Sequence, residues 1–425
     1  MGPRIYNLFP RLVGKMDKWK QHVSRIKNME FDWIYVNPFH YTGFSGSLYA
    51  PKNYYDFNPL FVDMSSIIPP IKQLEEFIEE SHKNGIKVIM DLVINHTSKD
   101  HPFTKTRRNW FKLGEDGNVV SPGAWDNGNW IEWGDLAIID NENSPDKQNL
   151  WNYWRDLIMF YLERGFDGFR ADAAYSIPSE LWIYLKEEAK TVNKDAVFFA
   201  ESLGCTMDKT LLLADSGFDY LFNSSKWWNF SDKWLLEQYE QTSVKIDSIG
   251  FPESHDTLRL PMEVNNDLNA VKQRMFFTAF FSSGWMIPIG FEYGFKKKTD
   301  VIKTFPSDWE PINYDISDMI KNINKTRSSY GIFNKDAKTT IYNGDNNNVL
   351  IMQKTSKDKT EKALIILNKD IYSSQTEKIA SLKGIVSEFK TVRDISIEKK
   401  LSEVKLNDLV INLSPGEVKI LHFDI

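Results

Sequence analysis

Three carboxylates stand directly after short apolar segments of this chain: Asp172 in GFRADA, Glu201 in FFAES and Asp256 in FPESHDT. Each segment has the pattern of a buried strand, and a carboxylate at its C-terminal end is poorly placed for packing. In a barrel of parallel strands such positions converge on one mouth, where active sites lie. A nucleophile, a proton donor and a third negative charge are what cleavage of a glycosidic bond through an oxocarbenium-like transition state requires.

Asp172 has a candidate partner two residues earlier, at Arg170. Side chains two positions apart on a strand share a face, so the guanidinium can hold the carboxylate ionised and aimed at a sugar carbon. Because a nearby opposite charge favours the charged form, we expect the pKa of Asp172 to be lowered. A purely structural Arg–Asp pair is the alternative, and an isolated R-x-D pattern would favour it.

Glu201 follows the apolar residues 197–200, and this environment is expected to raise its pKa and keep it protonated as a general acid. The alternative is that Glu201 opens the next helix, since Ser202 and Gly204 could begin a turn. Asp256 follows His255, and this pair can hydrogen-bond to two neighbouring ring hydroxyls while adding negative charge near the developing cation. Taken alone, His255 would more simply be a core histidine.

The elements that would position these residues alternate along the chain. Apolar segments with strand character occupy 5–9, 33–38, 87–91, 168–172, 197–201, 218–223, 247–251 and 285–290. Segments with apolar residues three to four apart, the mark of a helix, lie at 17–29, 70–84, 147–164, 179–190, 232–242 and 267–281. This alternation predicts an α/β fold with a parallel sheet, and eight repeats predict a (β/α)8 TIM barrel.

Two regions depart from the repeat. Residues 97–146, after the third strand, are rich in Trp, Asn, Gly and Asp without a clear helical period, which predicts an inserted subdomain. Residues 335–425 alternate apolar and polar positions between turn formers, which predicts a C-terminal antiparallel β-sandwich. The catalytic barrel would then comprise 1–96 and 147–330.

Composition limits the class of protein. The net charge of −6 argues against nucleic acid or an anionic membrane as the partner. The single cysteine, Cys205, excludes an internal disulfide framework. No segment has the length of a membrane span, and the N-terminus lacks the pattern of a signal peptide. We therefore expect a cytoplasmic protein that contacts neither nucleic acid nor membrane; its oligomeric state is left open.

Four ordered segments resemble the signature regions of the α-amylase superfamily, glycoside hydrolase family 13. They are DLVINH (91–96), GFRADA (168–173), the segment ending at Glu201, and ESHD (253–256); WGDLA (133–137) and GFEYG (290–294) are similar to two shorter motifs. The resemblance implies Asp172, Glu201 and Asp256 as catalytic residues. It implies substrate-binding roles for Tyr49, a stacking platform, and for His96, Arg170 and His255.

No cofactor is implied for the chemistry itself, and the sequence contains no phosphate-binding glycine loop or paired C-x-x-C motif. Many relatives hold a structural calcium ion, and the resemblance gives Asn95 and Asp135 as its ligands here. Calcium takes about six to eight oxygens, so these two residues alone do not define a site. The Lys-His that follows the nucleophile region in calcium-type amylases is replaced by Ala174-Tyr175.

Aromatic residues point to the substrate class. The chain has 14 Trp, and indole faces pack well on the C–H faces of sugars. For at least half of them, plain core packing is the simpler interpretation. The candidates for sugar contact are Trp110, Trp125, Trp130 and Trp133 in the insertion, and Trp227 and Trp228 after the sixth strand.

The sequence thus predicts a retaining enzyme that acts on α-1,4-glucans or malto-oligosaccharides by double displacement. Hydrolysis, as in an α-amylase, is the main interpretation. The alternative is a transglycosylase such as a maltosyltransferase or glucanotransferase. A non-catalytic amylase-fold protein, either a carbohydrate-binding or a transporter accessory protein, is a third interpretation, which retention of all three carboxylates disfavours.

Overall fold

The computed structural model describes residues 1–126 and 128–425, without the side chains of residues 125 and 126. Eight strands within these ranges close into a barrel, and every pairing between neighbours is parallel. They are β1 (Arg4–Leu8), β2 (Trp33–Val36), β5 (Lys87–Leu92), β10 (Gly168–Ala171), β11 (Val197–Ala200), β12 (Tyr220–Phe222), β13 (Asp247–Gly250) and β14 (Gly284–Pro288). Each of these strands overlaps one of the eight predicted segments, so the predicted (β/α)8 barrel is confirmed.

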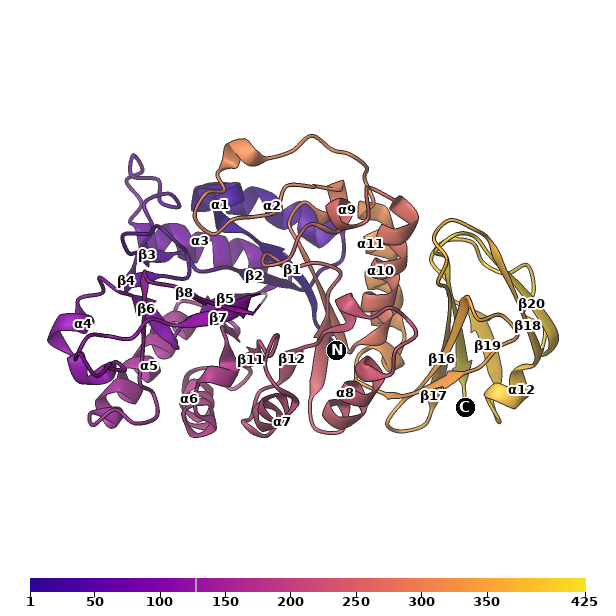
Figure 1. Cartoon of the computed structure of the whole chain (residues 1–425). Coiled ribbons are helices and arrows are strands. Elements are labelled where there is room, and N and C mark those ends of the chain that lie inside the picture. Colours follow the sequence, from indigo (N-terminus) through magenta and orange to yellow (C-terminus); the bar gives the residue numbers. More distant parts are fainter. Residues whose placement is uncertain (127) are drawn as a thin grey trace.

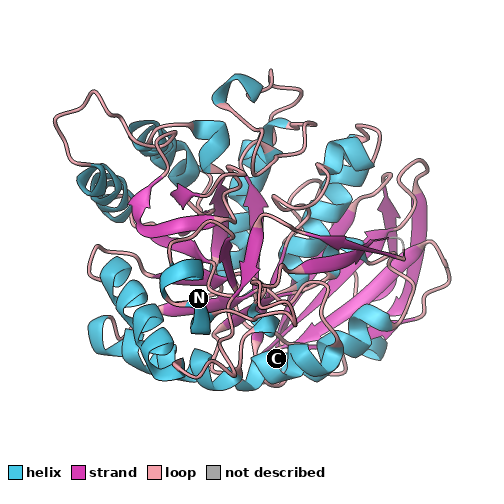
Figure 2. Cartoon of the chain, turned by 60° about the vertical axis from the view of Figure 1, so that its left-hand side comes forward, coloured by secondary structure: helices cyan, strands magenta, loops and turns pink. Residues whose placement is uncertain are grey.

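The strands are apolar on both faces because each face has its own core. Alternate residues point inward and fill the barrel, as Ile5, Tyr35, Ile89, Phe199 and Ile249 do. Their neighbours point outward and pack against the surrounding helices. Figure 2 shows the helices arranged around the central strands.

Each predicted helix is present: α2 (Met16–Asn28), α3 (Pro70–Lys83), α5 (Lys147–Leu162), α6 (Ser179–Val192), α8 (Trp234–Ser243) and α10 (Leu268–Phe281). Two long helices were not predicted, α7 (Met207–Asp215) and α11 (Ser317–Ser329). In α7 the apolar residues are Met207 and the contiguous run 211–214, so the helix shows little of the usual helical spacing. In α11 the buried positions are two isoleucines, Asn324 and Arg327, so half of its buried face is polar. The short helices are α1 (Pro10–Val13), α4 (Phe103–Thr106), α9 (Leu260–Glu263) and α12 (Leu382–Ile385).

Two excursions leave the barrel at the end where the strands finish. The first, after β2, is the hairpin of β3 (His40–Thr42) and β4 (Pro51–Phe57), with Tyr49 in its loop. The second follows β5 and forms two small antiparallel pairs, β6 (His96–Ser98) with β9 (Leu136–Ile138) and β7 (Gly123–Asp126) with β8 (Asn129–Glu132). The insertion therefore has strands that its sequence did not predict.

The C-terminal part is antiparallel and lies beside the barrel, at the yellow end of the chain in Figure 1. Its five-stranded sheet has the order β15 (Lys338–Tyr342), β16 (Val349–Thr355), β17 (Glu361–Asn368), β21 (Val418–Asp424) and β19 (Thr391–Asp394). A second pair, β18 (Gln375–Ser381) and β20 (Asn407–Leu413), shares an apolar core with one face of that sheet, as in a sandwich. The other face packs on the barrel helices, where the buried Lys354 Nζ donates to the backbone oxygens of Phe280 and Phe281. The domain boundaries at 97, 147 and 335 stay predictions.

Among the described residues, none of the helices combines the length and the apolar character needed to cross a lipid bilayer.

Candidate active site

The strand register brings the predicted residues to one mouth. β10 lies between β5 and β11, with Arg170 paired in register with Asp91 on one side and Phe199 on the other. The ladder continues beyond the strand ends, because the amide of Asp172 donates to Leu92 and the amide of Glu201 donates to Ala171, both at 3.1 Å. Asp172 and Glu201 are thus the next residues of two adjacent strands.

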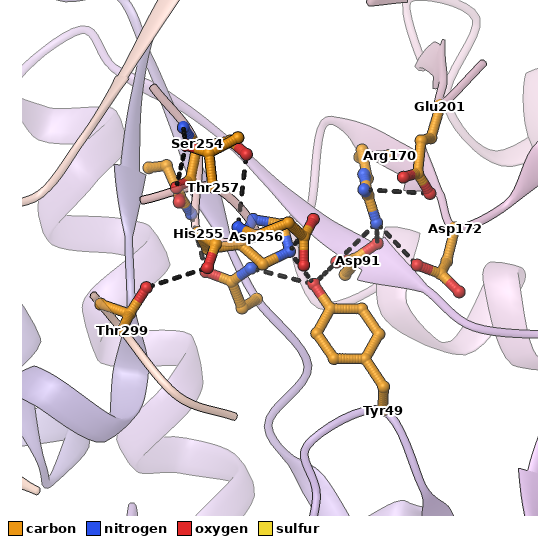
Figure 3. Close-up of polar contacts among 12 residues, drawn as sticks. Tyr49, Asp91, Arg170, Asp172, Glu201, Ser254, His255, Asp256, Thr257 and Thr299 are labelled. Atoms are coloured by element: carbon orange, nitrogen blue, oxygen red, sulfur yellow. Dashed lines mark hydrogen bonds and ion pairs between the residues drawn. The ribbon is translucent and has the colours of Figure 1, made fainter. Parts of the chain in front are cut away.

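One guanidinium connects three carboxylates at this mouth (Figure 3). Nη1 of Arg170 lies 2.8 and 3.0 Å from the two carboxylate oxygens of Asp91 and 2.9 Å from Oδ1 of Asp172. Nη2 lies 3.1 Å from Oε2 of Glu201. The side chain of Asp91 is fully buried and that of Arg170 is 5% exposed, whereas 13% of the Asp172 side chain and 16% of the Glu201 side chain are exposed. The two partly exposed carboxylates can therefore face a substrate.

The expected lowering of the pKa of Asp172 is wrong. Burial, followed by the negative charge of Glu201, raises the pKa of Asp172 well above its ordinary value. The charge of Arg170 opposes this effect, but the same guanidinium also neutralises Asp91 and Glu201. A guanidinium shared by three carboxylates stabilises the ionised form of Asp172 less than a guanidinium paired with Asp172 alone would.

Glu201 has polar neighbours despite its apolar strand. Its Oε2 accepts a hydrogen bond of 2.7 Å from the amide of Ala173, in addition to the contact with Arg170. Ala173 adopts a left-handed backbone conformation, with φ of 40°, which residues other than glycine rarely take. Strained backbone of this kind persists where the surroundings impose it, often at functional sites.

The other side of the mouth holds Tyr49, His255 and Asp256. The hydroxyl of Tyr49 donates to Oδ2 of Asp91 at 2.6 Å and lies 2.7 Å from Nε2 of His255. The same His255 nitrogen lies 3.1 Å from Oδ2 of Asp256, whose side chain is 57% exposed. Burial, and then the charge of Arg170, lowers the pKa of His255 to about 4, so the ring is neutral near pH 7.

Further contacts hold the backbone of this region. Oγ1 of Thr299 donates to the carbonyl of His255 at 3.1 Å. The first residue of the ESHD motif, Glu253, is fully buried and accepts a hydrogen bond of 2.8 Å from Arg259. These contacts fix the loop that carries Asp256.

The remaining predicted residues lie on the chain that leaves β5. Nε2 of His96 donates to the backbone carbonyl of Tyr49 at 2.8 Å, which leaves its Nδ1 for any other partner. Nδ2 of Asn95 lies 3.5 Å from Oδ2 of Asp172. His96 thus holds the backbone of the Tyr49 loop, and Asn95 borders the nucleophile candidate.

Calcium ligation by Asn95 and Asp135 stays a prediction. Oδ1 of Asn95 is buried without a hydrogen-bond partner, which suits a cation ligand. However, the described part of the chain has no group of three or more His, Cys, Asp or Glu side chains that could hold a metal. The donor set therefore fits only in part.

Three members of the cluster were not predicted as site residues: Asp91, Tyr35 and Asn37. Asp91 anchors Arg170, and Tyr35 donates to Oδ2 of Asp91 at 2.5 Å. Asn37 donates to the hydroxyl of Tyr49 at 3.0 Å. The sequence feature that could have identified this cluster is a charged residue, Asp91, within the apolar segment 87–92. A carboxylate that is buried there requires a partner.

The tryptophan candidates separate into two groups. Trp110 and Trp228 are buried, at 5% and 1% exposure, and belong to the core. Trp130, Trp133 and Trp227 are 50%, 44% and 50% exposed. The side chain of Trp125 lies outside the described residues.

A pocket opens between these two sides of the mouth. Its polar lining residues are Tyr35, Arg170, Glu201, Ser254, His255 and Asp256. Its apolar lining residues are Leu203, Phe222, Phe251 and Met286. The pocket thus combines two carboxylates, Glu201 and Asp256, with apolar side chains, as ligand sites commonly do.

Comparison with known proteins agrees with this arrangement. Residues 10–202 match the family "Alpha amylase, catalytic domain". The chain is 22% identical over 420 residues to an alpha-1,4-glucan:maltose-1-phosphate maltosyltransferase of Arcanobacterium haemolyticum, covering 87% of this chain and 59% of the relative. A protein of the same name from Myxococcus xanthus is 24% identical over 383 residues, covering 82% of this chain and 55% of the relative. The chain spans between about a quarter and two thirds of the length of such curated relatives.

Solved structures show the same fold from end to end. A noncanonic maltogenic alpha-amylase from Thermotoga neapolitana superposes with a TM-score of 0.78 at 19% identity, covering 100% of this chain and 99% of that chain. An alpha-amylase from Geobacillus thermoleovorans gives a TM-score of 0.79 at 18% identity, covering 100% and 98%. Residues 10–202 are thus similar to the catalytic domain of α-amylases, and the whole chain has the fold of the solved α-amylases.

Proposed function

We propose that this protein cleaves α-glucosidic bonds of malto-oligosaccharides or α-1,4-glucans by double displacement and transfers the glycosyl unit to an acceptor. The observation that carries the proposal is the bridge between Asp172 and Glu201: two carboxylates of adjacent strands contact the two terminal nitrogens of Arg170. A retaining mechanism needs one carboxylate on each side of the same bond, about 5–5.5 Å apart. The shared guanidinium favours that arrangement.

Each carboxylate has a separate role in this mechanism. Asp172 attacks the anomeric carbon, and the oxygen best placed to do so is Oδ2, because Oδ1 is held by Arg170. Glu201 gives its proton to the departing glycosidic oxygen, and a glycosyl ester of Asp172 forms. Glu201 then takes a proton from the acceptor hydroxyl, which attacks the same carbon and releases Asp172. Asp256 adds negative charge near the oxocarbenium-like transition state.

The polar cluster around Asp91 is suited to hold the donor sugar. The neutral imidazole of His255 and the exposed carboxylate of Asp256 lie 3.1 Å apart, so both can hydrogen-bond to neighbouring hydroxyls of one ring. The hydroxyl of Tyr49 is bound to Asp91, which fixes the ring plane for packing against a sugar. No cofactor takes part in these steps.

Transfer is supported by the curated relatives, several of which are named maltosyltransferases. Their name suggests maltose 1-phosphate as the donor and an α-1,4-glucan as the acceptor. Hydrolysis is the second candidate, and the observation that favours it is the end-to-end likeness to solved α-amylases. A purely binding role would not require Asp172 and Glu201 on a common guanidinium beside an open pocket.

Product analysis separates the two reactions. The protein is incubated with labelled maltoheptaose, alone, with inorganic phosphate, and with maltose 1-phosphate. Longer glucans from maltose 1-phosphate, or its formation from phosphate, indicate transfer, whereas shorter glucans with new reducing ends in all three mixtures indicate hydrolysis. Proton NMR of the first products is expected to show the α-anomer, and an initial β-anomer would reject double displacement.

A further inference from the structure

A second cavity, of about 420 Å³, lies where the β3–β4 hairpin meets α5 and the start of α4. Figure 1 shows these four elements at the end of the molecule opposite to the C-terminal sheets. Within the described part of the chain, none of the residues that line this cavity lines the pocket at the mouth. Its volume is in the range of small-molecule sites, and no step of the proposed mechanism uses it.

Three aromatic rings form a rigid part of the lining. Tyr153 of α5 meets Tyr55 of β4 edge to face, with centroids 6.1 Å apart and planes at 81°, and meets Phe103 in the same way at 5.1 Å and 78°. Tyr55 is also held by Phe160, at 4.9 Å and 88°. In the described part of the chain, the hydroxyls of Tyr55 and Tyr153 have no hydrogen-bond partner. The cavity therefore offers fixed apolar surface together with two unpaired hydroxyls.

His101 adds a hydrogen-bond donor to this lining. The residue is 3% exposed, and its Nδ1 accepts a hydrogen bond of 3.0 Å from the amide of Phe103. Burial lowers the pKa of His101 to about 4, so the ring is neutral near pH 7 and its one proton is on Nε2. Among the described residues, no group accepts a hydrogen bond from this nitrogen. The protein thus leaves a nearly buried donor at the cavity for an acceptor of a ligand.

The charges around the cavity select the class of ligand. Its cation, Lys52, is already bound to Asp100 at 2.6 Å, and Asp56 adds a negative charge, so an anion such as a phosphate is disfavoured. An amine would suit Asp56 but contains no acceptor for the N–H of His101. A neutral sugar fits both, because its hydroxyls donate and accept hydrogen bonds while its C–H faces pack on aromatic rings.

We propose that this cavity is a second glucan-binding site, which holds α-linked glucose units of a chain without cleaving them. The inference goes beyond the proposed function and rests on it only in taking the ligand to be a substrate glucan. The hairpin that lines the cavity also carries Tyr49, which lies at the mouth. A long glucan held at both places has a raised effective concentration at the mouth.

The test measures binding to glycogen by affinity electrophoresis, in the Asp172→Asn background so that turnover does not consume the ligand. Tyr41→Ala removes a ring that lines the cavity and is 42% exposed. His101→Asn removes the Nε2 donor, while the new side-chain oxygen can still accept from the amide two residues further on. Each change is expected to raise the Kd for glycogen about three- to tenfold, as loss of one aromatic contact or one hydrogen bond predicts.

Tyr372 supplies a matched control. It is 80% exposed and lines neither this cavity nor the pocket at the mouth, so Tyr372→Ala is expected to change the Kd by less than about twofold. With Asp172 restored, kcat/KM on maltotetraose should stay within about twofold for all three variants, because none of the changed residues lines the mouth pocket. Thermal melting separates misfolding from lost binding. Tyr153→Phe, which removes only a hydroxyl and should also weaken glycogen binding, keeps the test decisive if His101→Asn does not fold.

The outcomes distinguish this inference from the proposed function. Unchanged glycogen affinity in folded Tyr41→Ala and His101→Asn proteins would overturn the second site. Equal losses on maltotetraose would also overturn it, because they would originate at the mouth. Release of glycogen by choline rather than by maltose would identify an amine site instead. If the protein binds glycogen with the expected pattern but turns over no malto-oligosaccharide, the proposed function fails and the second site stands.

Discussion

The guanidinium of Arg170 reaches both oxygens of Asp91 through a single nitrogen, at 2.8 and 3.0 Å, while its other contacts go to Asp172 and Glu201. Asp91 is fully buried and also accepts hydrogen bonds from Tyr35 and Tyr49. The carboxylate of Asp91 is not itself exposed, but it positions the side chains that are exposed at the barrel mouth. We regard Asp91 as the positioning residue of the site.

Replacing Asp91 by Ala is expected to lower the free energy of unfolding by about 3–5 kcal/mol, because the buried charge of Arg170 loses its main partner. A misplaced Arg170 should also lower kcat at least about a hundredfold. Urea denaturation and steady-state kinetics measure the two effects. Asp215→Ala is the control, since its ion pair with Lys245 is exposed and should contribute less than about 1 kcal/mol. Equal stability of the two variants would contradict the role of Asp91.

Replacing Asp172 by Asn is expected to lower turnover of malto-oligosaccharides by several orders of magnitude. The amide is nearly isosteric, so the melting temperature should change little, and loss of the nucleophile removes the covalent path rather than a packing contact. Activity and melting temperature are measured on the same preparation. More than about a tenth of the original activity would rule out Asp172 as the nucleophile.

Replacing Glu201 by Gln is expected to abolish activity on substrates with poor leaving groups and to spare α-glucosyl fluorides in part, because fluoride leaves without a proton. Gln resembles the neutral Glu201 that acts as the acid, so the acid limb of kcat/KM on the fluoride, which requires ionised Asp172, should stay in place, whereas the basic limb set by Glu201 should disappear. Equal losses on both substrate classes would contradict these roles.

The barrel could be predicted because its strands are buried on both faces and therefore appear as continuous apolar segments. Helix α11 could not, since its buried face contains Asn324 and Arg327, whose partners lie far along the chain. Arg327 donates to backbone oxygens of residues 279–283 and of Phe333, contacts that no local pattern reveals.

Prediction of the site from the sequence has the same limit as prediction of the fold, because contacts between distant residues leave no local pattern. The three predicted carboxylates of the site stand at strand ends, which a sequence displays directly. The direction of the Asp172 pKa shift depends instead on how many carboxylates share Arg170. Asp91 is one of these carboxylates only because β5 pairs with β10. The spacing within one strand identified a partner for Asp172. Whether the pKa of Asp172 is raised or lowered depends instead on residues of the neighbouring strands.

A last prediction concerns His40 and stability. This residue is 2% exposed and packs among Phe39, Tyr54 and Tyr161, and burial lowers its pKa to about 3. The unfolded chain binds a proton below about pH 6.5 that the folded protein does not accept. The free energy of unfolding should therefore fall as pH decreases from about 6.5 toward 3, and His40→Phe should make this fall shallower.

His82 gives a control of opposite sign. Its hydrogen bond to Asp167, 2.8 Å long, raises its pKa, so its stabilising contribution is present below its unfolded pKa and is lost as pH rises through the folded one. His82→Gln should make the loss of stability on acidification steeper, where His40→Phe makes it shallower. Urea denaturation at pH 4.5, 5.5, 6.5 and 7.5 measures the slopes. Two variants that shift the slope in the same direction would contradict the assignment of a neutral, buried His40.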